Sequence, residues 1–194
     1  MNRTLQATLL TAVMAIAAST SQAQVFTAHL SGANESPPNA SPGTGEAIVT
    51  LDTLLNTMRV QVNFSGLTAN ATASHIHAST ATPFTGTAGV ATTTPTFAGF
   101  PAATSGSYDN TLDLTLSSSY NPAFVTANGG TTASAEAALL KGIFDGKSYL
   151  NIHTSNNPTG EIRGFLAAPE PGTMAFLSGM GFFGTLLALR RRRR

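Results

Sequence analysis

Short runs of alternating apolar and polar residues restrict the fold of this chain more than any other feature. The clearest run spans 57–64, and its apolar members are Met58, Val60, Val62 and Phe64. Successive side chains of a strand point to opposite faces, so this run buries one face and exposes the other. Similar runs, bounded by Gly, Pro, Asn and Ser, recur along the chain. The predicted strands are 25–30, 45–51, 57–64, 71–77, 107–116, 148–153 and 161–166.

These short strands, with their threonine-rich faces, predict an all-β fold, either a β-sandwich or a small barrel. One short helix is expected at 134–144, where Ala135, Leu139 and Ile143 recur at helical spacing. The segment 79–106 is rich in Thr, Ala, Gly, Ser and Pro. It is expected to form a long surface loop with one weak strand.

Composition limits the chemistry that the chain can perform. Of its 194 residues, 42% are hydrophobic and 10% are charged, and cysteine is absent. Soluble domains usually carry roughly 25% charged residues. The lack of cysteine excludes disulfides, iron–sulfur clusters, thiolate zinc sites and cysteine nucleophiles. The length fits one domain together with processing segments.

The positive charge is concentrated at the two ends of the chain. Arg3 and the five arginines 190–194 make up six of the ten cationic residues. Residues 24–168 hold four cationic and eight acidic residues, which gives a net charge of −4. Nucleic-acid binding needs clustered Lys and Arg on the folded part, so no nucleic-acid partner is expected.

Residues 1–23 are predicted to be a signal peptide. A basic start at Arg3 is followed by an apolar stretch, 5–18, and then by small and polar residues. Small side chains suit the pocket of the cleaving enzyme, and cleavage is predicted between Ala23 and Gln24. The alternative is an N-terminal membrane helix, but the apolar run is shorter than the roughly 20 residues needed to span a bilayer.

The C-terminal end has three parts: Pro169-Glu170-Pro171, an uncharged and mostly apolar stretch at 173–189, and the arginines 190–194. Such a stretch is long enough to form a transmembrane helix, and the arginines would keep its end on the cytoplasmic side. The alternative is a buried core helix, in which five adjacent like charges would have no role.

This C-terminal end resembles the PEP-CTERM sorting signal of exported bacterial proteins, with Pro169, Glu170 and Pro171 as the sorting motif. The resemblance implies a Gram-negative-type bacterium and a precursor held transiently in the inner membrane by residues 173–189. It also implies the export machinery and an exosortase-type sorting enzyme as partners. The expected destination is the cell surface or the extracellular matrix.

Three histidines are the candidate metal ligands. His75 and His77 flank Ile76, so the two imidazoles share one strand face while Ile76 points to the core. His153 occupies the corresponding face of a second predicted strand. Three converging imidazoles would form a nitrogen site for zinc or copper, with metal–nitrogen bonds of about 2.0 Å. The alternative is a group of polar surface histidines beside a turn, and His29 is expected to cap a strand end.

Several blocks of the body resemble the CHRD domain, which was first described in chordin and is common in secreted microbial proteins. The blocks are Leu30-Ser31-Gly32-Ala33-Asn34-Glu35-x-Pro37-Pro38, Gly66-Leu67-Thr68, His75-Ile76-His77, Tyr149-Leu150-Asn151-Ile152-His153-Thr154, and Asn157-Pro158-x-Gly160-Glu161-Ile162-Arg163-Gly164. They spread over nearly all of the predicted domain, 24–168. The family-motif residues are Gly32, Asn34, Glu35, Pro37, Pro38, Gly160, Glu161, Arg163 and Gly164.

The CHRD pattern in turn resembles Cu/Zn superoxide dismutase in outline, which implies an immunoglobulin-like β-sandwich whose strand histidines hold copper. His75, His77 and His153 are the residues that this resemblance carries over. The chain lacks a bridging histidine, a zinc-ligand cluster and a structural disulfide. One mononuclear copper or zinc ion is therefore the most that the sequence predicts, and no cofactor is certain.

No catalytic residue is predicted, because the chain has no Gly-x-Ser-x-Gly elbow, no phosphate-binding loop and no paired carboxylates. Glu161 and Arg163 share a strand face and are expected to form a cross-strand salt bridge. The main hypothesis is a non-enzymatic exported protein that binds an extracellular polysaccharide or protein, or has a structural role. The alternative is a metal-binding protein with redox activity.

Overall fold

The computed structural model describes residues 23–169. Its strands lie where the alternation predicts them, with ends that differ by a few residues. They are β1 (Gln24–Ser31), β2 (Thr44–Asp52), β3 (Thr57–Ser65), β4 (Ala71–His77), β5 (Gly106–Asp113), β6 (Tyr149–Thr154) and β7 (Ile162–Phe165). The all-β prediction is confirmed.

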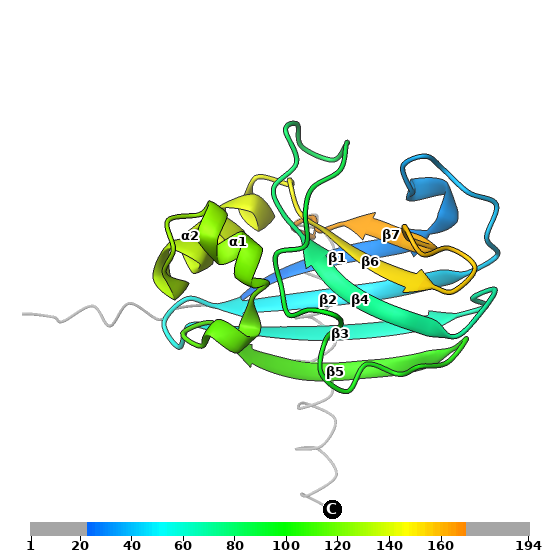
Figure 1. Ribbon diagram of the computed structural model, residues 1–194, viewed down its shortest axis with the longest axis horizontal. Coiled ribbons are helices and arrows are strands. Elements are labelled where there is room, and N and C mark those ends of the chain that lie inside the picture. The colour runs from blue at the N-terminus through cyan, green and yellow to red at the C-terminus, as the bar shows by residue number, and fades with distance from the viewer. Residues whose placement is uncertain (1–22, 170–194) are drawn as a thin grey trace, which may run out of the picture.

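The strands of residues 23–169 form one antiparallel sheet in the order β4-β6-β7-β1-β2-β3-β5. The pairing between β7 and β1 is short, with Ser31 opposite Arg163 and a bridge between Thr27 and Ala167. At this joint the sheet curls, so that β4 and β6 lie across β1 and β2 (Figure 1). The two halves are thus parts of one continuous sheet and not two separately hydrogen-bonded sheets.

The core lies inside the curl. On β3 the side chains of Met58 and Val60 are fully buried, while Arg59 between them is exposed. From the other half of the sheet, Ile76 and Leu150 are fully buried as well. Burying such side chains stabilises the fold by about 1.5–3 kcal/mol each. The alternation in the sequence is therefore the pattern of core and solvent on a curved sheet.

Two helices cover one end of the sheet, where the sequence predicts one (Figure 1). They are α1 (Pro122–Ala127) and α2 (Thr132–Phe144), and 3₁₀ turns occur at η1 (Gly32–Asn34) and η2 (Ser117–Ser119). Asn121 caps α1 through Ala123 N, and Thr131 and Ser134 form a capping box on α2. The prediction of a single helix missed α1 because six residues are too few to show helical spacing.

The segment after β4 is more than a surface loop. Phe97 and Thr92 within it are fully buried. Its backbone bonds to β4, from Ala91 N to Ile76 O at 2.9 Å and from Phe97 N to Ser74 O at 3.0 Å. The expected weak strand is reduced to isolated bridges. This covering loop, 78–105, therefore lies along the edge strand β4.

The two hydrophobic targeting helices that the sequence predicts fall at 1–23 and 173–189, almost wholly outside the described residues. Within residues 23–169, no helix is both long and apolar enough to cross a membrane.

Candidate metal centre

The three candidate histidines come together on the outer face of β4 and β6. These strands are hydrogen-bonded neighbours, with His75 opposite Asn151. Ile76 points to the core, which leaves His75 and His77 on the same face as His153. One ring nitrogen of each histidine lies within 4.8 Å of the others. Atoms so spaced share a centre no more than about 2.8 Å from each, so small shifts would bring them to the metal–nitrogen distance of about 2.0 Å.

Each imidazole has one nitrogen held by the backbone. The nitrogen-to-carbonyl distances are 2.8 Å from His75 Nε2 to Pro95, 2.9 Å from His77 Nδ1 to Ala88, and 3.0 Å from His153 Nδ1 to Pro158. A carbonyl only accepts, so each of these nitrogens carries the proton. The remaining nitrogens, His75 Nδ1, His77 Nε2 and His153 Nε2, are buried without a hydrogen-bond partner in residues 23–169. Each keeps a free lone pair.

The histidines are neutral at physiological pH. Burial lowers the pKa of His75 to about 4, helped by the nearby His153. Burial also lowers the pKa of His77 to about 4 and lowers that of His153. Neutral imidazole is the form that binds a metal ion.

The covering loop buries His75 and His77, two members of this cluster. His75 and His77 are 6% and 8% exposed, whereas the alternative of polar surface histidines predicts exposed rings. Two of the three carbonyls that hold the rings, those of Ala88 and Pro95, belong to this loop. The sequence predicted the convergence of the histidines but not their burial. Every residue type has a backbone carbonyl, so the loop sequence contains no pattern from which this role could be predicted.

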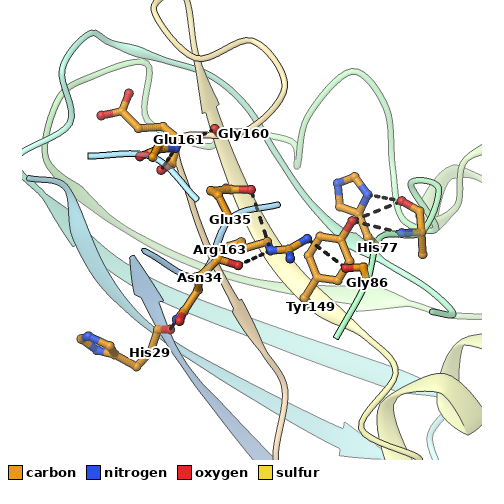
Figure 2. Close-up of polar contacts among 11 residues, drawn as sticks. His29, Asn34, Glu35, His77, Gly86, Tyr149, Gly160, Glu161 and Arg163 are labelled. Atoms are coloured by element: carbon orange, nitrogen blue, oxygen red, sulfur yellow. Dashed lines mark hydrogen bonds and ion pairs between the residues drawn. The ribbon is translucent and has the colours of Figure 1, made fainter. Parts of the chain in front are cut away.

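A layer of aromatic and charged side chains continues from the histidines along the same face. Tyr149 stacks on His77, with ring centroids 4.7 Å apart, and both contact Ala88 O. The Arg163 guanidinium lies over the other side of the Tyr149 ring, 4.7 Å from its centroid. Figure 2 shows Arg163 between Glu35 and Tyr149, with His77 beyond. The family-motif residues Glu35 and Arg163 thus adjoin the histidine cluster.

Glu161 and Arg163 do not pair with each other, contrary to the expectation from their shared face. Arg163 Nε lies 3.8 Å from Glu35 Oε2 instead. The fully buried Glu161 carboxylate accepts from Thr68 N at 2.6 Å, from Ser41 Oγ at 2.6 Å and from Thr154 Oγ1. Burial opposes its ionisation, yet these hydrogen bonds hold the pKa of Glu161 below its ordinary value. Glu161 therefore joins three segments of the fold.

His29 is not a strand cap. It lies within β1, opposite Glu46 on β2, and its Nδ1 is 2.5 Å from Glu46 Oε1. Both side chains are exposed, so this contact contributes little to stability. His29 takes no part in the histidine cluster.

The remaining predicted site residues lie in the loop after β1 or are glycines at which two segments approach closely. The η1 turn and the loop after it contain Asn34 and the exposed Pro37 and Pro38, and Asn39 Nδ2 donates from this loop to Glu161 O at 3.1 Å. Gly160 has φ +135°, and a Cβ there would meet the Glu35 carboxylate at 2.7 Å. The other motif glycines, Gly32 and Gly164, also lie at close approaches, against Asn39 and the His29 carbonyl.

The predicted processing sites lie at the borders of the described region. Gln24 begins β1, so cleavage after Ala23 would leave every strand intact. Pro169 is the last described residue, and Glu170 and Pro171 lie outside the described residues.

Comparison with protein-family models identifies the family of this chain. The CHRD domain model matches residues 26–166. The chain belongs to the CHRD domain family. The PEP-CTERM protein-sorting motif matches residues 167–193. No curated protein and no solved structure matches the chain.

Together the two matches describe an exported CHRD-domain protein whose precursor is anchored in the membrane and sorted by an exosortase-type system. The sequence-based recognition of both parts is confirmed. The resemblance to Cu/Zn superoxide dismutase is not tested by these comparisons, since no solved structure matches the chain.

Proposed function

We propose that this exported CHRD domain binds one copper or zinc ion through His75, His77 and His153. The observation that carries the proposal is the arrangement of the ring nitrogens. In each ring one nitrogen is bonded to a backbone carbonyl, and the other is buried without a partner among residues 23–169. Hydrogen bonds of this kind orient the histidine ligands of metal sites.

The donor set suits the proposed ions. Imidazole binds zinc and copper well, and three protein ligands leave a fourth position open for water or a small ligand. No acidic side chain of residues 23–169 extends the cluster. The site therefore contributes three neutral ligands, and a bound ion keeps its full charge.

A purely structural cluster of histidines explains the geometry less well. A buried polar atom without a hydrogen bond costs about 1–3 kcal/mol. Here each of the three clustered histidines carries one such nitrogen. A structural role would be served equally well by apolar or fully hydrogen-bonded side chains, whereas metal binding uses all three lone pairs.

The test is the metal content of protein purified from the cells that make it and then exposed to micromolar copper or zinc. We expect about one ion per chain. His75→Ala and His153→Ala should each lower the affinity at least 100-fold, because each removes one ligand. His29→Ala is the matched control, since His29 is exposed and outside the cluster.

The proposal fails if the unmodified protein remains metal-free in micromolar copper and zinc. It also fails if His29→Ala lowers metal binding as much as His75→Ala does. Circular dichroism of each variant would show that the fold is retained.

We also propose how the domain reaches its place of action. Residues 1–23 would be removed as a signal peptide, 24–168 would form the working domain, and 169–194 would direct sorting. Cleavage near Pro169-Glu170-Pro171 would then deliver the domain to the cell surface or extracellular matrix. Replacing this motif with alanines should leave the precursor in the membrane fraction, as measured by immunoblotting of separated fractions.

A further inference from the structure

A second site lies beside the histidine cluster, on the other side of Arg163. It is a pocket of about 450 Å³ between the loop after β1, residues 84–86 and strand β7. Arg163 and Glu35 supply its charged groups, and Phe84 and Phe165 supply its aromatic surface. None of these residues is among the proposed metal ligands, and Arg163 adjoins the histidine cluster through the stacked Tyr149 ring.

Arg163 has hydrogen-bonding capacity that the fold does not use. Its guanidinium carries five N–H donors, and the side chain is almost fully buried. Nε donates to Asn34 O at 2.5 Å and Nη1 donates to Gly86 O at 3.1 Å. Nη2 makes no hydrogen bond within residues 23–169. Arg163 itself lines the pocket, beside Asn34 and Gly86, so a ligand there would lie next to its guanidinium.

Glu35 does not fully neutralise this guanidinium. Its nearest carboxylate oxygen is 3.8 Å from Arg163 Nε, beyond a direct hydrogen bond. Burial raises the pKa of Glu35 to about 7, although Arg163 opposes the shift. Close to neutral pH the carboxyl is therefore protonated for much of the time, and Arg163 keeps a net attraction for one negative charge.

Phe84 presents an aromatic face beside these polar groups. Its side chain is 59% exposed, and its φ of +58° is unusual for a bulky residue. Phe84 N donates to Gly146 O at 2.8 Å, and the ring contacts Phe165 edge-on at 6.2 Å between centroids. The ring thus rests on Gly146 and Phe165 but stays more than half exposed, and it lines the pocket.

We propose that this pocket binds a carboxylate carried on a six-membered ring. The carboxylate would accept hydrogen bonds from the free Arg163 donors, and the ring would lie against Phe84 and Phe165. One cation suits a ligand with one negative charge better than a doubly charged phosphate. Both sugar acids and aromatic acids have this chemistry, so the experiment distinguishes them.

The test uses saturation-transfer NMR on the full chain in detergent, with galacturonate, benzoate and neutral galactose as probes. We expect transfer to galacturonate and none to galactose, because only the acid can use Arg163. Transfer to benzoate alone would also support the carboxylate site and would identify aromatic acids as its ligands. Equal transfer to galactose and galacturonate, or no transfer to either acid, would overturn the proposal.

Two variants locate the binding. Phe84→Gly removes the ring at a positive φ that glycine tolerates, so it should fold normally and weaken binding about tenfold. Arg163→Lys keeps the charge but loses the planar fork, and should weaken binding as well. Leu54→Ala, which removes an exposed apolar side chain outside the pocket, is the matched control and should bind normally. Unchanged binding in Phe84→Gly would contradict the assignment, even if Arg163→Lys failed to fold.

Discussion

At the scale of single residues, a backbone carbonyl decides which nitrogen of each histidine is free. His75 is held through Nε2, whereas His77 and His153 are held through Nδ1. The free nitrogens are therefore of mixed type, with Nδ1 offered by one ring and Nε2 by two. A metal ion would find the three lone pairs already fixed and would not have to compete with a proton.

The first prediction concerns these tautomers. In metal-free protein at pH 7, His75 should be the Nε2–H tautomer, and His77 and His153 should be Nδ1–H tautomers, because a carbonyl accepts only from a protonated nitrogen. Long-range proton–nitrogen NMR measures this directly. His29, which faces a carboxylate, serves as the internal comparison. A rapid mixture of tautomers at His75 would contradict the arrangement described here.

Glu35 supports a prediction on pH. Its ordinary pKa of 4.5 is raised to about 7 in the folded chain, chiefly by burial and despite the facing Arg163. Between pH 4.5 and pH 7, the Glu35 carboxyl is ionised in the unfolded chain, whereas in the folded chain it still holds its proton. Stability from this group is therefore present below pH 4.5 and falls as the pH rises through 7.

Glu35→Gln removes this titration. The free energy of unfolding of the variant, relative to the unmodified chain, should rise by about 2 kcal/mol between pH 5 and pH 8.5. Urea unfolding of metal-free protein at the two pH values measures it, and the histidine titrations cancel because both proteins share them. A difference that stays constant with pH would show that Glu35 has an ordinary pKa.

At the scale of the elements, the sheet curls at the short joint between β1 and β7. Gly164 on β7 faces β1 so closely that a Cβ would lie 2.9 Å from the carbonyl carbon of His29 and nearer still to its oxygen. These are backbone atoms, which cannot move without shifting the strand. Glycine is thus required here for the approach of two strands.

Gly164→Ala should destabilise the domain by about 1–3 kcal/mol, because it overpacks this joint. Gly89→Ala is the matched control: a Cβ there meets nothing within 4 Å, and the substitution should be neutral or stabilise by about 0.4–1 kcal/mol. Thermal or urea unfolding measures both. Equal stability of the two variants would mean that β7 moves away from β1 at little cost.

Some of these elements and contacts could be predicted from the sequence, and others could not. Alternation predicted every strand, because each has one face in the core, and it placed His75, His77 and His153 on one side of the sheet. It did not predict α1, which is short and depends on its Asn121 cap. Nor did it predict the pairing of Arg163 with Glu35, which joins residues 128 positions apart through contacts that have no periodicity.

At the scale of the whole molecule, a bound ion would connect parts that the chain keeps separate. The ligands lie on β4 and β6, while the carbonyls that orient them belong to the covering loop and to the turn after β6. Metal binding should therefore stabilise the entire half of the sheet, not only the site.

Metal binding should raise the temperature of thermal unfolding. An ion present at 100 times its Kd adds about 2.7 kcal/mol to stability. In a domain of this size, such a gain corresponds to a rise in Tm of roughly 5–10 °C. Calorimetry with copper or zinc, and again after a chelator, measures the shift. The same rise in a His75→Ala, His77→Ala double variant would place the stabilising ion elsewhere.

The covering loop has one more consequence, which concerns association between molecules. A sheet of seven strands ends in two edge strands, here β4 and β5, and an open edge can recruit a strand from another chain. Along β4, the loop already occupies backbone groups of Ser74, Ile76 and Ala78. The loop that buries the histidines thus also blocks strand addition at β4. We therefore expect no strand-to-strand association between molecules along β4, even at high protein concentration.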